Sequence, residues 1–128
     1  MQLKHLNLAT SDVGGLASFF ERFFGFERLM TRGQDAFALM CNQDEFVLTL
    51  MKAKKHDPAA YPETFHVGFY LDAADAVQAK HNELAQAGLS PGKIQIPSRG
   101  GCRVTTFYCN APGGVVIEIA TPPGLAAE

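Results

Sequence analysis

The sequence predicts an α+β protein made of two tandem modules, each with the order strand, helix, strand, strand, strand (βαβββ). Apolar residues recur first with a strand period and then with a helix period, in the same order twice along the chain. Turn residues separate these stretches, and each half opens on a strand that contains a histidine. We therefore expect the 128 residues to form one domain, with module 1 at about residues 1–51, a connector at 52–63 and module 2 at 64–122.

The first module begins with a predicted strand over residues 3–9, followed by candidate helix caps at residues 10–12. An amphipathic helix is predicted next, because large apolar residues recur at spacings of three and four until Gly25 ends the helix. These residues are Leu16, Phe19, Phe20, Phe23 and Phe24. Strand-like stretches then complete the module at residues 26–30, 35–41 and 45–51.

The second module follows a connector, residues 52–63, in which two prolines exclude a regular element. Its predicted elements are a strand at 65–71, a helix capped by Asp72 and ended by Gly88, and strands at 93–96, 103–109 and 115–120. We expect a flexible loop at 98–101 and a tight turn at 111–114. Because each half is too small to close a core alone, the helices should cover one side of curved sheets and leave a concave cleft on the other.

The composition argues against binding to nucleic acid or to membranes. The net charge is -2, 47% of residues are hydrophobic and 19% are charged, so no basic surface is expected. No apolar run is long enough to span a bilayer. The three cysteines are odd in number and lack CxxC spacing, which favours a reducing, cytoplasmic location; they are Cys41, Cys102 and Cys109.

Glu118 lies in the middle of the apolar strand predicted at residues 115–120. Burial of an unpaired carboxylate is costly, so Glu118 needs a cationic side chain, a hydrogen-bond network or a metal ion. His5 and His66 lie on two other predicted strands, each with a largely apolar opposite face. The three side chains converge if those strands share one sheet. The alternative is that the histidines are structural and that Glu118 pairs with Arg103 on a neighbouring strand.

The order and spacing of these pieces resemble the vicinal oxygen chelate superfamily, which includes glyoxalase I, bleomycin and fosfomycin resistance proteins and extradiol dioxygenases. The matching pieces are the His5-Leu6-Asn7-Leu8 strand, the helix end at 19–26, Phe65-His66-Val67, and the stretch from 106–108 through 117–119. The resemblance implies the glyoxalase/bleomycin resistance/dioxygenase fold. It also implies a metal ion bound by residues of the first and last strands of the modules, and a homodimer.

Carried over from the family, the metal ligands fall on His5, His66 and Glu118, and Glu118 is also the expected catalytic residue. The family's fourth ligand falls on Leu48, or on Thr49 if the register differs by one residue. Neither is a carboxylate, so we do not expect a standard four-ligand glyoxalase I. Two imidazoles and one carboxylate suit one divalent ion, Fe, Mn, Zn or Ni, and leave positions open for water and substrate.

Other polar residues on the predicted strand faces are candidate substrate contacts: Asn7, Thr49, Tyr70 and Arg103. Arg99 and Lys93 flank the glycine-rich loop and are candidates for closing over an anionic substrate. His56 and His81 are not expected to be ligands, because one lies in the connector and the other on a helix.

Two functions follow from the resemblance and stay open at this point. The first is a metal-dependent enzyme, such as a lyase, isomerase, ring-cleaving dioxygenase or thiol transferase, whose small substrate chelates the metal through adjacent oxygens. The second is a metal-free protein that binds a drug or metabolite, as bleomycin resistance proteins do. Retention of three ligand-type residues favours the enzyme, and loss of the fourth favours the binding protein.

Overall fold

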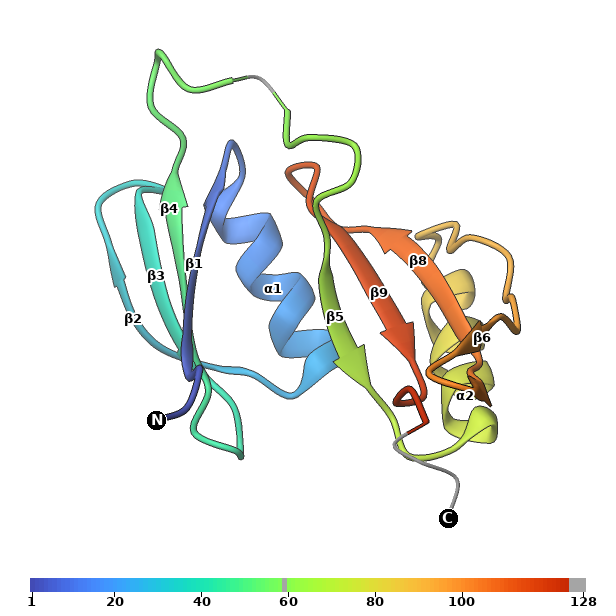
Figure 1. Cartoon of the computed structure of the whole chain (residues 1–128). Coiled ribbons are helices and arrows are strands. Elements are labelled where there is room, and N and C mark those ends of the chain that lie inside the picture. The colour runs from blue at the N-terminus through green and yellow to red at the C-terminus, as the bar shows by residue number, and fades with distance from the viewer. Residues whose placement is uncertain (59, 125–128) are drawn as a thin grey trace. The chain divides into compact units, whose positions relative to one another are not determined.

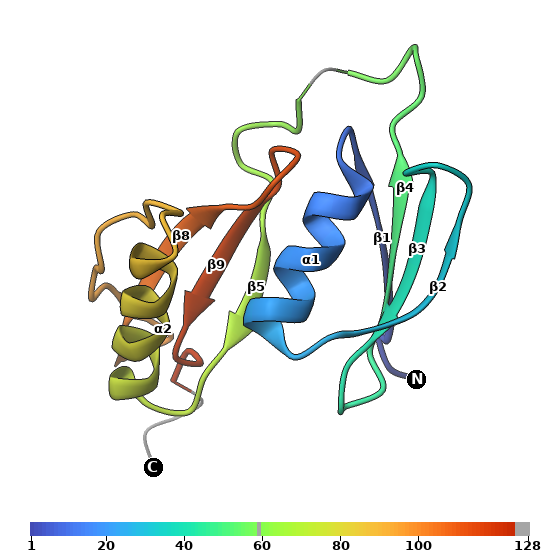
Figure 2. The same ribbon diagram turned by 180° about the vertical axis from the view of Figure 1, so that it is seen from behind.

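The computed structural model describes residues 1–58 and 60–124, and position 59 of the predicted connector lies outside these ranges (Figures 1 and 2). The chain divides into two compact units. Unit 1 comprises residues 1–61 and 112–114, and unit 2 comprises residues 62–111 and 115–128. Each unit contains one helix and one main sheet, so the predicted α+β class with two modules is confirmed.

Unit 1 has the predicted βαβββ order and forms one four-stranded sheet with the strand order β1-β4-β3-β2. The outer strand β1 runs parallel to β4, and the other neighbours are antiparallel. The elements are β1 (His5–Thr10), α1 (Val13–Phe24), β2 (Glu27–Arg32), β3 (Phe37–Cys41) and β4 (Val47–Lys52). The first and last strands of the module therefore lie side by side, which brings residues some 40 positions apart into register.

The core of unit 1 lies between its sheet and α1, which packs against β2, β3 and β4. Alternate residues of the strands face the helix and are buried, and the helix contributes the predicted phenylalanine face. Each large apolar side chain that is removed from water here contributes roughly 1.5–3 kcal/mol. The fully buried members include Leu8, Leu16, Phe20, Met40 and Leu50.

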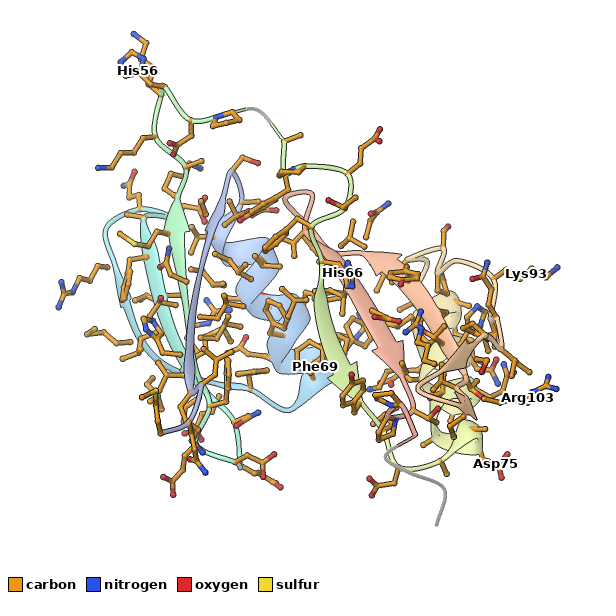
Figure 3. The ribbon with its side chains drawn as sticks, viewed as in Figure 1. His56, His66, Phe69, Asp75, Lys93 and Arg103 are labelled. Atoms are coloured by element: carbon orange, nitrogen blue, oxygen red, sulfur yellow. The ribbon has the colours of Figure 1, made fainter. Side chains whose placement is uncertain are left out.

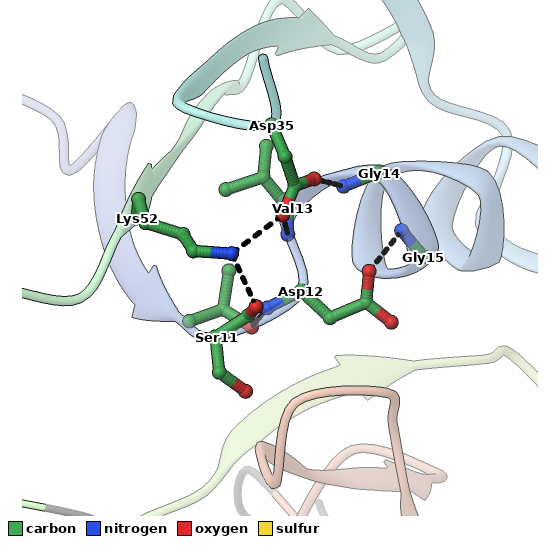
Figure 4. Close-up of polar contacts among 8 residues, drawn as sticks. Ser11, Asp12, Val13, Gly14, Gly15, Asp35 and Lys52 are labelled. Atoms are coloured by element: carbon green, nitrogen blue, oxygen red, sulfur yellow. Dashed lines mark hydrogen bonds and ion pairs between the residues drawn. The ribbon is translucent and has the colours of Figure 1, made fainter.

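The N-terminus of α1 is held by two carboxylates, one predicted and one not (Figure 4). Asp12 is the predicted cap, and its carboxylate accepts a hydrogen bond from the backbone N–H of Gly15 at 2.8 Å. Asp35, from the turn between β2 and β3, accepts the N–H of Gly14 at 2.6 Å and forms a 2.8 Å ion pair with Lys52. The hydrogen bond from Lys52, followed by that from Gly14, lowers the pKa of Asp35. Asp35 thereby connects the β2–β3 turn to the N-terminus of α1 and to the end of β4.

Unit 2 repeats the arrangement with a shorter sheet, in which the strand order is β5-β9-β8. Again the first and last strands are parallel, and β8 is antiparallel to β9. The helix α2 packs against β9 and buries Val77 and Leu84. The elements are β5 (Val67–Tyr70), α2 (Ala74–Gln86), β8 (Thr106–Asn110) and β9 (Val116–Ala120). In the described part of the chain, neither helix has the length and apolar character needed to cross a membrane.

The segment between α2 and β8 differs from its prediction. The strand predicted at residues 93–96 is wrong, because only one isolated bridge forms there, between Gln95 and Thr106. Pro91 and Pro97 flank this bridge and have no backbone N–H to extend a ladder. The flexible loop predicted at 98–101 is instead a small hairpin made of β6 (Ser98–Arg99) and β7 (Cys102–Arg103).

Two further boundaries differ from the sequence prediction. Gly100 and Gly101 form the turn of the hairpin with φ values of 62° and 76°. Arg103 therefore belongs to β7, and the strand predicted at 103–109 begins only at residue 106, as β8. The helix α2 begins after Ala73 rather than after Asp72, so the predicted Asp72 cap is wrong. The hairpin matters for the site, because it carries Arg99.

Candidate functional site

Glu118 is the central residue of β9 and is buried, with 8% of its surface exposed. In the sheet register it lies between Gly68 of β5 and Tyr108 of β8. Because paired residues share a face, the side chains of β5, β8 and β9 around it point to the side of the sheet opposite the buried Ile117 and Ile119. Gly68 has no side chain to cover the carboxylate: a Cβ there would lie 3.9 Å from Oε1.

One carboxylate oxygen of Glu118, Oε2, accepts two hydrogen bonds. The hydroxyl of Thr106, which is fully buried, donates at 2.6 Å, and Nη1 of Arg99 donates at 2.7 Å. Burial is the largest influence on Glu118 and acts to raise its pKa, but these two hydrogen bonds together bring the pKa below its ordinary value. Glu118 is therefore an ionised carboxylate at neutral pH.

The ion pair between Glu118 and Arg103, which was the alternative to a metal site, is wrong, because Arg99 is the partner of Glu118. The two arginines lie on opposite strands of the β6–β7 hairpin. The hydrogen bond and the charge of Glu118 raise the pKa of Arg99, and the Tyr108 side chain adds to this effect. Figure 3 shows Arg103 and Lys93 at the outer side of unit 2, away from His66.

The other carboxylate oxygen of Glu118, Oε1, faces His66 Nε2 at 3.4 Å. His66 immediately precedes β5, and its Nδ1 lies 3.1 Å from the backbone carbonyl of Thr64 (Figure 3). A carbonyl oxygen only accepts, so Nδ1 carries a proton and donates it. The His66 ring meets the Tyr108 ring edge-on, with the ring centres 5.4 Å apart. The imidazole is thus oriented from two sides.

His5 in unit 1 takes part in a different hydrogen-bond chain. Its Nε2 lies 3.1 Å from the Thr49 hydroxyl, which donates to Asn7 Oδ1 at 2.8 Å. The hydroxyl has a single hydrogen, so His5 Nε2 is the donor toward Thr49. A ligand bond from Nε2 would require this hydrogen bond to break.

The register decides which residue of unit 1 corresponds to Glu118. Asn7 pairs with Thr49 in β1 and β4, as Gly68 pairs with Glu118 in β5 and β9. Thr49 is therefore the counterpart of Glu118, so the first placement, on Leu48, is wrong and the alternative, Thr49, is correct. Leu48 faces the core with 2% of its surface exposed.

The remaining predicted residues are distributed as follows. Tyr70, at the end of β5, shares the Glu118 face and is 63% exposed. His56 lies in the connector, at the periphery of unit 1 (Figure 3). His81 donates from Nε2 to the Gly92 carbonyl at 2.9 Å, and its ring packs edge-on against Phe107, so it has a structural contact of its own.

It was not predicted from the sequence that Thr106 and Tyr108 lie beside Glu118. The tight turn at residues 111–114 could have shown this, because it sets the register of the two strands that it joins. A hairpin across that turn pairs Asn110 with Val116, and counting back by twos places Tyr108 opposite Glu118 and Thr106 on the same face.

The geometry of His66 Nε2 and Glu118 Oε1 in unit 2 is compatible with a bound divalent cation. When His66 carries its proton on Nδ1 alone, its Nε2 lone pair faces an ionised carboxylate oxygen 3.4 Å away, and a cation between these two acceptors would relieve their repulsion. Two atoms bound to one tetrahedral zinc at ~2.1 Å lie about 3.4 Å apart. The hydrogen bond from Nδ1 to a carbonyl is the usual support of a metal-bound histidine. Among the residues that the structure describes, however, no group of three or more His, Cys, Asp or Glu side chains is placed to hold a metal.

Two modules, each with its first strand parallel to its last, define a fold of the glyoxalase type. The sequence model of the Glyoxalase/Bleomycin resistance protein/Dioxygenase superfamily matches residues 2–119. The chain belongs to this superfamily.

Solved structures agree with this assignment. A possible glyoxalase from Bacillus cereus is 40% identical, with a TM-score of 0.75 over 93% of this chain and 97% of that chain. Lactoylglutathione lyase from Agrobacterium tumefaciens is 16% identical, with a TM-score of 0.73 over 94% and 92% of the two chains. A variant of the fosfomycin resistance protein FosX from Listeria monocytogenes, in complex with Mn(II) and 1S,2S-dihydroxypropylphosphonic acid, is 14% identical, with a TM-score of 0.75 over 94% and 92%. The last two show the fold alone. Among curated proteins, none matches the sequence.

Proposed function

We propose that this chain is a divalent-metal-dependent enzyme whose small substrate chelates the metal through adjacent oxygens, with His5, His66 and Glu118 as the protein ligands. The observation that carries the proposal is the pairing of His66 Nε2 with Glu118 Oε1 at 3.4 Å. A protein of the same fold, at 14% identity, was crystallised with Mn(II) and a dihydroxyphosphonic acid, and this fold-level analogy is why we choose such an ion and such a ligand as candidates. The proposed metal is Fe, Mn, Zn or Ni.

The chemistry divides between the ion and the side chains. A bound divalent ion would act as a Lewis acid on substrate oxygens. Thr106 and Arg99 keep Glu118 ionised, so Glu118 supplies negative charge at neutral pH. Thr64 and Tyr108 fix the orientation of the His66 ring. Reactions compatible with this arrangement include lyase, isomerase, dioxygenase and thiol transferase chemistry.

A standard four-ligand glyoxalase I is not part of the proposal. Thr49, the counterpart of Glu118 in unit 1, has a hydroxyl that is engaged with His5 and Asn7. A hydroxyl cannot provide the negative charge of a carboxylate, nor readily take up a proton at neutral pH. We propose that Thr49 and Asn7 contact substrate, and that Tyr70 provides a further contact.

A second candidate function is a metal-free protein that binds a drug or metabolite. The observation that favours it is the ion pair between Arg99 and Glu118, which satisfies the buried carboxylate with a side chain already present. In unit 1, β3 and β4 also place apolar side chains on the His5 face of the sheet, namely Phe37, Leu39 and Met51. Such residues would suit an apolar ligand.

The experiment that tests the proposal is metal content by elemental analysis, on protein purified without chelator or affinity metal. Fe(II), Mn(II), Zn(II) and Ni(II) are then added back to wild type and to Glu118→Ala, His66→Ala and His5→Ala. Matched controls are Glu83→Ala, at a carboxylate on α2 that pairs with Lys80, and His81→Ala. We expect about one metal per chain in wild type and in both controls, and strong loss in the three ligand variants.

Uptake of metal by none of these proteins, together with unfolding temperatures that added ions do not change, would contradict the proposal. Ligand binding would then be screened instead of turnover, to test the second candidate. Metal retained in His5→Ala but lost in the other two ligand variants would remove His5 from the ligand set.

A homodimer and a cytoplasmic location belong to the same proposal. The three cysteines are free thiols, which is consistent with a reducing compartment. Light scattering coupled to size exclusion, with and without the metal that binds, measures the oligomeric state and shows whether assembly depends on the ion.

A further inference from the structure

Arg99 places a positive charge directly on the carboxylate that we propose as a metal ligand. Its Nη1 lies 2.7 Å from Glu118 Oε2, and the Thr106 hydroxyl binds the same oxygen at 2.6 Å. The opposite oxygen, Oε1, faces His66 Nε2 at 3.4 Å. The Glu118 carboxylate therefore binds the Arg99 guanidinium through Oε2, while Oε1 faces the His66 imidazole.

A guanidinium and a divalent ion at one carboxylate compete for the same negative charge. Each cation lowers the electrostatic gain of binding the other, and the two cations repel each other across the small carboxylate group. The 38% exposure of the Arg99 side chain means that water screens part of this repulsion. The residual effect is nevertheless large, because the Glu118 side chain is only 10% exposed.

The placement of Arg99 also allows its guanidinium to leave Glu118. Arg99 lies in the two-residue strand β6, whose hairpin turns through Gly100 and Gly101, and its side chain is 38% exposed, so the guanidinium can move from Glu118 into water. When the guanidinium is withdrawn from Glu118, Thr106 still donates to Oε2. The carboxylate thus keeps one donor while it accepts a second cation.

We propose that Arg99 is an internal competitor of the metal ion and sets the affinity of Glu118 for divalent cations. The guanidinium occupies Glu118 when the ion is absent and weakens the binding of the ion when it arrives. This inference rests on the proposed function, since it requires that Glu118 binds the ion. It gives Arg99 a role different from that of a substrate-anion contact, because the partner of its charge is a residue of the protein.

The test is a titration of metal-free protein with Mn(II), followed by calorimetry and by the electron paramagnetic resonance signal of free Mn(II). The variants are Arg99→Gln, which removes the charge, and Arg99→Lys, which keeps it. Arg99→Met is a second neutral variant in case Arg99→Gln does not fold, as judged by circular dichroism. Arg103→Gln is the matched control, because it removes the same charge from the other strand of the hairpin. Glu118→Gln reports whether the ion uses the carboxylate.

We expect the neutral Arg99 variants to bind Mn(II) about tenfold more tightly than wild type, or more, because a neighbouring cation has been removed. Arg99→Lys and Arg103→Gln should stay within about threefold of wild type.

Two results would overturn the inference in distinguishable ways. Equal or weaker Mn(II) binding in the neutral Arg99 variants, together with loss of binding in Glu118→Gln, would leave the proposed function standing and make Arg99 an orienting partner only. Mn(II) binding in neither wild type nor any Arg99 variant would remove the proposed function together with the inference.

Discussion

The hydroxyl of Thr106 should stabilise the protein by keeping Glu118 charged, and Thr106→Val tests this directly. Valine has nearly the shape of threonine, so the substitution removes a hydrogen-bond donor while packing changes little. Thr106 is fully buried and donates to Glu118 Oε2 at 2.6 Å, so water cannot readily replace it. A hydrogen bond to a charged group contributes about 1.5–3 kcal/mol, and we expect that loss of unfolding free energy at pH 7 in metal-free buffer.

The loss of unfolding free energy in Thr106→Val should depend on pH, because it depends on the charge of Glu118. Burial raises the pKa of Glu118, but the Thr106 and Arg99 hydrogen bonds outweigh it and hold the folded-state pKa below the ordinary value of 4.5. A group with a lowered pKa contributes stability that is complete above its unfolded pKa and is lost as the pH falls through its folded pKa. The destabilisation by Thr106→Val should therefore be largest near pH 7 and should shrink as the pH falls below about 4.5.

The assay is urea denaturation at pH 7 and pH 3 in the presence of EDTA. Thr105→Val is the matched control, because the hydrogen bond of Thr105 to Thr121 is made by its backbone N–H rather than by its hydroxyl. An equal loss at both pH values would assign the effect to packing. A loss at pH 7 no larger than that of the control would refute the role of the Thr106 hydroxyl.

Further predictions concern unit 1. Gly113→Ala should cost at least about 2 kcal/mol, because the φ angle of 84° is unfavourable for alanine and the new Cβ would lie 1.9 Å from Thr10 Oγ1. Gly114→Ala is the control: its φ is 88° and no described atom lies within 4 Å of its Cβ, so it should cost only about 1–2 kcal/mol. If chemical denaturation gives equal losses of stability for Gly113→Ala and Gly114→Ala, the steric contact with Thr10 is excluded. Asp35→Asn should lower the unfolding temperature at neutral pH, because the ion pair with Lys52 and the helix cap are weakened. Since the pKa of Asp35 lies below 3.8 in the folded state, the difference should disappear as the pH falls through that lowered pKa, and calorimetry at pH 7 and pH 2 checks this.

Local sequence patterns were sufficient for most of the fold. The spacing of phenylalanines fixed the buried face of α1, and Asp12 was recognisable as its cap because its carboxylate reaches an N–H only three residues away. The burial of Glu118 followed from its apolar neighbours in β9. These features depend on residues that are close in the sequence, where periodicity and side-chain chemistry are informative.

Features that depend on distant contacts were less accessible. Leu48 and Thr49 differ by one position, and in a strand one position exchanges the two faces. Only the pairing of β1 with β4 decides between them. Asp35 caps a helix that begins more than 20 residues earlier, so no local motif identifies it.

The choice between Arg99 and Arg103 shows a third limit. Arg99 directly precedes the glycine pair 100–101 and Arg103 follows it by two residues, and either side chain is long enough to reach a neighbouring strand. The hairpin of β6 and β7 decides which one meets Glu118, and that hairpin depends on positive φ angles at Gly100 and Gly101. Glycine permits such angles without requiring them, so the sequence left the partner of Glu118 undetermined.

The irregular segment beside β8 also has a consequence for self-association. An exposed strand edge offers unpaired N–H and C=O groups, on which a strand from another molecule can add and start aggregation. Here the segment 92–97 occupies that edge through hydrogen bonds from Gly92 to Tyr108 and between Gln95 and Thr106. The prolines at 91 and 97 keep this cover from becoming a regular strand with a new edge of its own. The protein thus closes one side of its smaller sheet and resists intermolecular strand pairing there, even at high concentration.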